Sequence, residues 1–200
     1  MENRVLLIAC GALAKELVEI QKRNDWSHLK IQCLPADLHH TPARIPGAVV
    51  AAIDRYGKDY ENIFVAYADC GTSGMLDRAL EAYKVERLPG AHCYEWFAGE
   101  RNFAEICEAE PGTFFLTDFL VRHFDRLVVQ SLGIDRHPEL KALYFGNYKR
   151  VVYLAQTASD ELSAKARNHA AFLGLDYEHR HTGLERVASS LQEHVVRWQN

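Results

Sequence analysis

The stretch VAYADCGTSG, residues 65–74, runs from an apolar segment through a cysteine into a glycine-rich turn. The segment IFVAYA around its start is almost continuously apolar, as a central parallel strand is because both of its faces are buried. The segment GMLDRALEAYK after the turn repeats its apolar residues at helical spacing. A strand, a turn and a helix in this order form the repeating unit of an α/β fold.

The same order of elements recurs along the chain. VLLIACGALAKEL, residues 5–17, places Cys10 directly after an apolar run, and VERLPGAHCYEWF, residues 85–97, places Cys93 after a shorter one. Helical patterns separate the candidate strands, at residues 4–9, 29–34, 62–67, 85–88, 150–155 and 176–180. This alternation predicts a three-layer α/β/α fold with a mostly parallel sheet and right-handed crossovers.

The region between the fourth and fifth candidate strands, residues 103–147, has mostly helical spacing, from FAEICEAE through DFLVRHFDRLVVQSLG to PELKALYF. We interpret it as a helical insertion in a single α/β domain over residues 1–200, because no linker or low-complexity segment interrupts the chain. A second small domain is the alternative. Farther on, SDELSAKARNHAAFLG starts at Ser159 and stops at Gly174, as a helix with a glycine C-cap does.

Charge and hydropathy indicate which classes of binding partner the protein lacks. The chain carries 23 Lys and Arg against 27 Asp and Glu, a net charge of −4, and no basic stripe that would neutralise phosphates. We therefore expect no binding to nucleic acid. No run of about 18 apolar residues is present, so no membrane span is expected. The short apolar run near the N-terminus resembles a first strand rather than a signal peptide, which favours a cytoplasmic protein.

Cysteines end three of the strand-like segments. The chain has 5 cysteines, and in a reducing compartment these are metal ligands, nucleophiles or core residues more often than disulfides. Ligands bind outside the carboxyl ends of parallel strands, so Cys10, Cys70 and Cys93 are predicted to converge if their strands are neighbours. The alternative is that they are small buried hydrophobes. Cys33 and Cys107 lie within an apolar run and a helical pattern, and we interpret them as core residues.

Three thiolates match two kinds of metal centre. Zinc held by three protein ligands keeps a fourth position open, which is typical of a catalytic site. The alternative is a [4Fe–4S] cluster held by the same three cysteines. The predicted metal ligands are therefore Cys10, Cys70 and Cys93, with Zn(II) as the first choice and [4Fe–4S] as the second.

Polar residues beside the thiols are candidates for chemistry. Asp69 is a candidate general base, an acceptor that orients a ligand, or a turn former. His92 is a candidate fourth ligand or proton carrier. Glu95 follows Cys93 closely enough to face the same pocket. Gly71, Thr72 and Ser73 form the turn that leads into the next predicted helix, and we predict that their backbone N–H groups bind an anionic cofactor or substrate. His39 and His40 follow the second strand and form a weaker pair of rim candidates.

Several motifs together resemble a family of bacterial and archaeal proteins catalogued as domain of unknown function 1638. These motifs are LIACGALAKEL, LPADLHHTP, FVAYADCGTSGMLD, LPGAHCYEWFAG, EPGTFFLTDFLVRHFDR and YFGNYKRVVYLAQT, and they span nearly the whole chain. The resemblance implies a link with corrinoid-dependent methyl transfer and one-carbon metabolism, with a corrinoid protein or methyltransferase as partner. Carried over motif by motif, it points at Cys10, Cys70 and Cys93.

Four functional hypotheses follow. The first is a metal-dependent transferase or lyase that acts on a small-molecule substrate at a three-cysteine zinc site. The second is a [4Fe–4S] enzyme acting on a small carboxylate. The third is an accessory protein that binds a metal or cofactor without turnover. The fourth, a redox thiol enzyme, needs paired cysteines, and the sequence spacing shows no such local pair.

Overall fold

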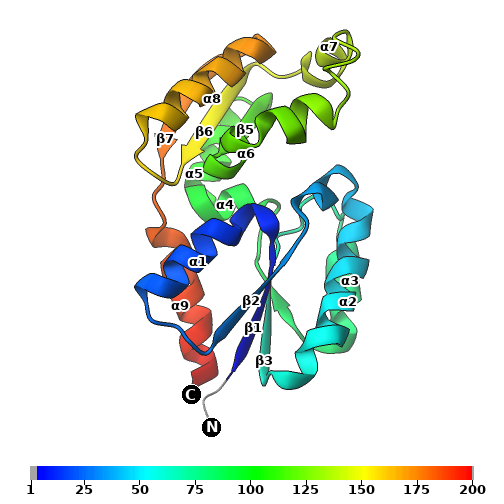
Figure 1. Cartoon of the computed structure of the whole chain (residues 1–200), viewed down its shortest axis with the longest axis vertical. Helices are drawn as coiled ribbons and strands as arrows, with labels where there is room; N and C mark the ends of the chain where they lie inside the picture. The colour runs from blue at the N-terminus through cyan, green and yellow to red at the C-terminus, as the bar shows by residue number, and fades with distance from the viewer. Residues whose placement is uncertain (1–3, 200) are drawn as a thin grey trace. The chain divides into compact units, whose positions relative to one another are not determined.

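The computed structural model describes residues 4–199, which form two compact units (Figure 1). The first unit runs up to Cys93 and includes the residues from Val187 onward, and the second comprises Tyr94–Arg186. Each unit has its own parallel sheet. In the part of the chain that is described, no helix is both long and apolar enough to cross a membrane.

The first unit is built on a four-stranded parallel sheet in the order β2-β1-β3-β4. Its strands are β1 (Val5–Cys10), β2 (Leu29–Leu34), β3 (Asn62–Ala66) and β4 (Glu86–Arg87). Every residue of β1 is buried, as its central position requires. Helices α1 (Ala14–Arg23) and α9 (Glu185–Gln199) cover one face, and α2 (Ile45–Tyr56) and α3 (Met75–Leu80) cover the other (Figure 1).

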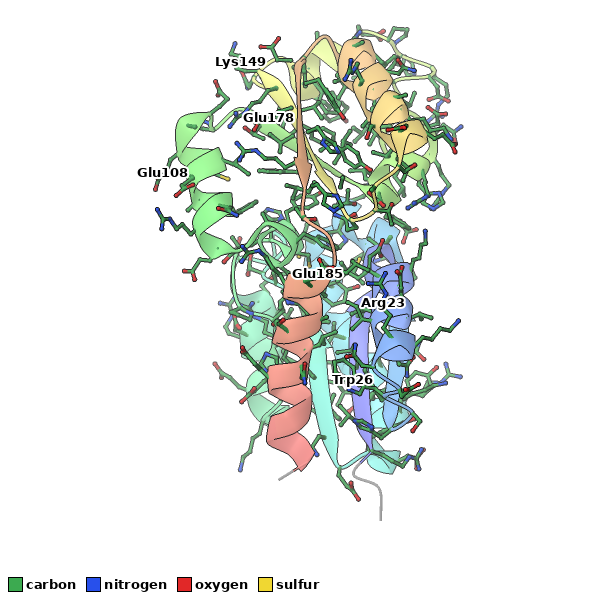
Figure 2. The ribbon with its side chains drawn as sticks, turned by 90° about the vertical axis from the view of Figure 1, so that its left-hand side faces the viewer. Arg23, Trp26, Glu108, Lys149, Glu178 and Glu185 are labelled. Carbon is green, nitrogen blue, oxygen red and sulfur yellow. The ribbon has the colours of Figure 1, made fainter. Side chains whose placement is uncertain are left out.

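The second unit has a three-stranded parallel sheet in the order β5-β6-β7. Its strands are β5 (Thr113–Thr117), β6 (Arg150–Ala155) and β7 (Asp176–His181). Its helices are α4 (Cys93–Ala98, of which Cys93 belongs to the first unit), α5 (Glu100–Ala109), α6 (Asp118–Arg122), a π-helix (Asp125–Gln130), α7 (Leu140–Phe145) and α8 (Asp160–Leu173). Arg150 on β6 pairs with Glu178 on β7 at 2.7 Å (Figure 2 marks Glu178).

Helices cover both faces of this second sheet as well. On one face, β6 packs through Val151, Tyr153 and Ala155 against the apolar side of α8. On the other, the ring of Phe115 lies 5.4 Å from that of Tyr94 on α4 and 5.1 Å from that of Phe103 on α5. The α/β class, the parallel pairing and the layers of helices are therefore confirmed.

The structure corrects the sequence interpretation in two places. The strands divide between two sheets, one in each compact unit, where a single sheet was expected. The region 103–147, interpreted as a helical insertion, contains the strand β5. The run TFFLT is only 5 residues long and leads directly into α6, so its periodicity could not separate strand from helix.

A buried carboxylate joins the loops that follow β5 and β6. Asp118, 1% exposed, accepts hydrogen bonds from the Tyr153 hydroxyl at 2.6 Å and from the backbone N–H groups of Gln156 and Thr157 at 3.1 Å each. The Thr157 hydroxyl also donates to it, and Arg122 lies 3.5 Å away. A buried charge supplied with this many donors is satisfied, so Asp118 stabilises the second unit.

Replacing Asp118 with Asn should lower the free energy of unfolding by about 3 kcal/mol, because an amide nitrogen would face donors where an oxygen now accepts. Urea unfolding followed by circular dichroism measures the change. Asp135→Asn is the matched control, since Asp135 is exposed in the same unit. A loss below about 1 kcal/mol in the Asp118 variant would contradict the structural role.

Candidate thiol and metal site

Backbone pairing beyond the ends of β3 and β4 brings two of the predicted cysteines together. Asp69 donates its N–H to the carbonyl of Gly90 at 3.1 Å, and Cys70 donates to that of Ala91 at 2.8 Å. Cys93 follows two residues later, and its sulfur lies 3.3 Å from the sulfur of Cys70. The juxtaposition therefore results from main-chain hydrogen bonds between segments separated by about one α/β unit.

The loop that carries Cys70 is organised by Asp69. The Asp69 carboxylate accepts the N–H of Ser73 at 3.0 Å, the N–H of Gly74 at 2.8 Å and the hydroxyl of Thr72 at 2.8 Å. These bonds hold a left-handed turn in which φ is 48° at Cys70, 83° at Gly71, 52° at Ser73 and 75° at Gly74. A left-handed conformation costs a non-glycine residue about 1–2 kcal/mol, which the hydrogen bonds to Asp69 offset.

Cys10 enters the same site from the end of β1. Its sulfur accepts the N–H of Ala12 at 3.4 Å, and the Nδ1 of His39 lies 3.7 Å from it. His39 belongs to the short helix Ala36–His40 that follows β2, the strand paired with β1 in the register Cys10 to Leu34. Its Nδ1 also lies 3.2 Å from the carbonyl of Ala36, so an Nδ1–H is shared between this carbonyl and the Cys10 sulfur.

The imidazole of His39 and the neighbouring cysteine sulfurs change one another's pKa values. Burial alone would lower the pKa of His39, but hydrogen bonds to Cys10 and Cys70 outweigh it and raise that pKa to about 10. Donation from Cys93, followed by hydrogen bonding to His39, lowers the pKa of Cys70. The same sulfur contact and burial raise the pKa of Cys93. Of the two sulfurs in contact, Cys70 therefore has the lower pKa, because it is the one that interacts with the imidazole.

Main-chain groups around the sulfurs favour their ionised form. Ala12 donates its N–H to the Cys10 sulfur at 3.4 Å, the backbone of Cys93 helps to lower the pKa of Cys70, and the backbone of Ala68 partly opposes the rise in the pKa of Cys93. A neutral thiol is a weak acceptor, whereas a thiolate is stabilised by such donors. The backbone at this edge of the sheet is therefore arranged to favour anionic sulfur.

Tyr67 is a member of the site that the sequence interpretation missed. It is fully buried just beyond β3, its ring stacks on that of His39 at 6.1 Å, and its hydroxyl has no hydrogen-bond partner among the described residues. Burial, followed by the nearby Cys10, raises the pKa of Tyr67. In the sequence, Tyr67 stands out only as a single hydroxyl near the end of the apolar run IFVAYA. The pattern of that run predicts a strand and gives no indication of a functional residue.

The other predicted site residues have different surroundings. The Asp69 carboxylate is engaged within its own loop, and the N–H groups of Thr72 and Ser73, predicted to bind an anion, already donate to Asp69. His92 is exposed, and Glu95 is half-buried on the part of α4 that belongs to the second unit. Gly71 contributes its left-handed backbone conformation to the loop.

The two remaining cysteines have other environments. Cys33 pairs with Ala9 in the β1–β2 register, so its side chain lies on the opposite face of the sheet from that of Cys10. Cys107 is half-buried on α5 in the second unit. Within residues 4–199, no three His, Cys, Asp or Glu side chains surround a common point at metal-binding distances, so the thiols are adjacent without being arranged as a finished coordination sphere.

Comparison with known proteins gives one match. The model of the family described as "Protein of unknown function (DUF1638)" matches residues 33–191. No curated protein and no solved structure matches the chain.

Gly71 allows a test of the loop. Gly71→Ala should lower the free energy of unfolding by about 1–2 kcal/mol, because φ is 83° and a Cβ would lie 3.3 Å from the Cγ of Pro42. Gly47→Ala is the control, since Gly47 lies in α2 with nothing within 4 Å of the new Cβ. That variant should be unchanged or more stable by up to about 1 kcal/mol. Equal effects in urea unfolding would show that the loop is not constrained as described.

Proposed function

The chain belongs to the DUF1638 family, a family of unknown function, and we propose from the site itself that it is a metal-dependent enzyme in which Cys10, Cys70 and Cys93 bind zinc. The observation that carries this proposal is the placement of three cysteine sulfurs at one edge of the sheet, with 3.3 Å between those of Cys70 and Cys93 and with Cys10 3.7 Å from His39. The N–H of Ala12 and the charged ring of His39 stabilise anionic sulfur there, and thiolates are the form in which cysteine binds zinc.

The spacing of the site favours zinc over an iron–sulfur cluster. Two sulfurs bound to one tetrahedral zinc are roughly 3.8 Å apart, given bonds of about 2.3 Å. The sulfurs of Cys70 and Cys93 are 3.3 Å apart, so a small outward movement would admit one metal ion. A cubane cluster separates its cysteine sulfurs further, to roughly 6–7 Å. Binding zinc therefore requires less rearrangement of this edge of the sheet.

His39 and Tyr67 supply the acid–base groups of the proposed site. Zinc bound by three cysteines would act as a Lewis acid toward a thiol or water at its fourth position. The His39 ring lies 3.7 Å from the Cys10 sulfur, and because its pKa is raised to about 10 it carries a positive charge at neutral pH, where it can donate a proton to such a ligand. The Tyr67 hydroxyl, which lacks a partner among the described side chains, can donate to a ligand there.

The family resemblance suggests the process in which this chemistry takes part. A thiolate at a zinc centre is a suitable methyl acceptor, so we propose a small-molecule substrate in corrinoid-linked methyl transfer or one-carbon metabolism, with a corrinoid protein or methyltransferase as partner. An accessory protein that carries the metal without turnover is the second candidate, and it is favoured by the burial of Cys10 and Cys70, at 1% and 3% exposed. Multiple turnovers by the isolated protein would exclude it.

Metal content tests the proposal. Protein purified anaerobically without chelators should contain about one zinc per chain, and Cys70→Ser should lose most of it because two thiolates leave the ion under-coordinated. Cys33→Ser and Cys107→Ser are matched controls that should retain it. His39→Gln should also retain it, because the imidazole acts beside the three sulfurs rather than as a ligand. Elemental analysis measures all five samples.

Three other metal contents would overturn the proposal. Zinc retained in Cys70→Ser would place the metal elsewhere. About four irons per chain with acid-labile sulfide would show that the site holds an iron–sulfur cluster instead of zinc. Wild-type protein without any bound metal would contradict both the zinc and the cluster interpretations.

A further inference from the structure

We propose that Cys70 and Cys93 are also a redox-active dithiol pair that closes reversibly to a disulfide by exchange with a small disulfide. This activity goes beyond metal binding and does not depend on it. Local spacing in the chain does not indicate a pair, since the two cysteines are separated by α3 and β4. The fold makes them neighbours, with 3.3 Å between their sulfurs in the free-thiol state.

The backbone holds both sulfurs in place for exchange. Cys70 is fixed in its left-handed conformation by the loop around Asp69, and its N–H is bonded to Ala91, two residues before Cys93. The two sulfurs therefore need to approach by little more than one ångström to reach the bonding distance of about 2.05 Å. By contrast, the Cys10 sulfur is held by Ala12 and faces His39.

The two cysteines differ in accessibility, which assigns their roles in exchange. Cys93 is half-buried, whereas Cys70 is 3% exposed. An external disulfide RSSR therefore meets Cys93 first. Cys93 passes its proton to Cys70 across the 3.3 Å sulfur contact and attacks one sulfur of RSSR as the thiolate. The S–S bond breaks, a mixed disulfide forms on Cys93, and the departing RS⁻ takes the proton from Cys70. The Cys70 thiolate then attacks the Cys93 sulfur and expels the second RS⁻. Two protein thiols are oxidised, RSSR is reduced to two RSH, and the two cysteine protons end on the leaving thiolates.

Metal and disulfide compete for the same two sulfurs. A disulfide sulfur carries no thiolate charge and does not hold zinc, so exchange occurs in the metal-free protein. The experiment is therefore carried out after the protein has been dialysed against a chelator. Its result is independent of whether the purified protein contained zinc, so failure of the metal proposal and failure of this one can be told apart.

The sequence provides a direct assay. Trypsin releases each cysteine on a separate peptide, at residues 5–15, 31–44, 59–78, 88–101 and 102–122. Metal-free protein is equilibrated with oxidised and reduced glutathione at a series of ratios, alkylated and mapped by mass spectrometry. We expect the peptides 59–78 and 88–101 to become linked at a single midpoint ratio, with the other three cysteines alkylated throughout. Reduction with excess glutathione should restore all 5 alkylated cysteines.

Variants distinguish disulfide formation between Cys70 and Cys93 from general oxidation of the protein's thiols. Cys93→Ser should form no intramolecular disulfide and should keep Cys70 as a thiol or a glutathione adduct. Cys107→Ser, which lies in the second unit, should form the 59–78 to 88–101 link with the midpoint of the wild type. The wild-type map decides the question even if a variant fails to fold. Linkage through Cys10 or Cys33, or no linkage before all cysteines carry glutathione, would overturn the proposal.

Discussion

The candidate site depends on two backbone hydrogen bonds made just beyond the end of a very short strand. β4 is only 2 residues long, yet the pairing of its chain with that of β3 continues through Gly90 and Ala91 to Asp69 and Cys70. A parallel pair brings segments together without constraining their separation in sequence. Because the pairing continues as far as Cys70, the sulfur of Cys93 is delivered to it, and the Asp69 loop fixes the direction in which Cys70 points.

Few groups of the protein balance negative charge at this edge of the sheet. The imidazole of His39 serves the sulfurs of Cys10 and Cys70, and Ala12 donates a main-chain N–H to Cys10. Arg87 adds positive charge near Cys70, although its guanidinium is already bound to Asp77 at 2.6 and 2.8 Å. More than one full thiolate in this environment requires a cation, a proton or a covalent bond between sulfurs. The metal and the disulfide are two of these solutions.

Local patterns predicted the elements of the fold, and long-range pairing decided how they assemble. The strand at residues 150–155 and the helix from Ser159 to Gly174 were predicted at their observed limits, because an apolar run, a serine N-cap and a glycine C-cap are local signals. The division into two sheets was missed because it depends on β5 pairing with β6, and neither segment contains a sequence signal that identifies its partner strand. The cysteines were found because each follows a strand, whereas Tyr67 was missed because a tyrosine in an apolar run packs like any aromatic residue.

The same geometry also explains how metal binding and disulfide exchange would compete for two sulfurs without unfolding the site. Zinc needs the Cys70 and Cys93 sulfurs slightly farther apart than 3.3 Å, and a disulfide needs them closer. The free-thiol state lies between these two distances, so neither product requires the Asp69 loop to unfold. Cys10 then distinguishes the two outcomes, because its sulfur would be a ligand of the metal but would take no part in the disulfide. If both proposals hold, the site would bind metal through all three sulfurs under reducing conditions and would be closed by a disulfide between two of them under oxidising conditions.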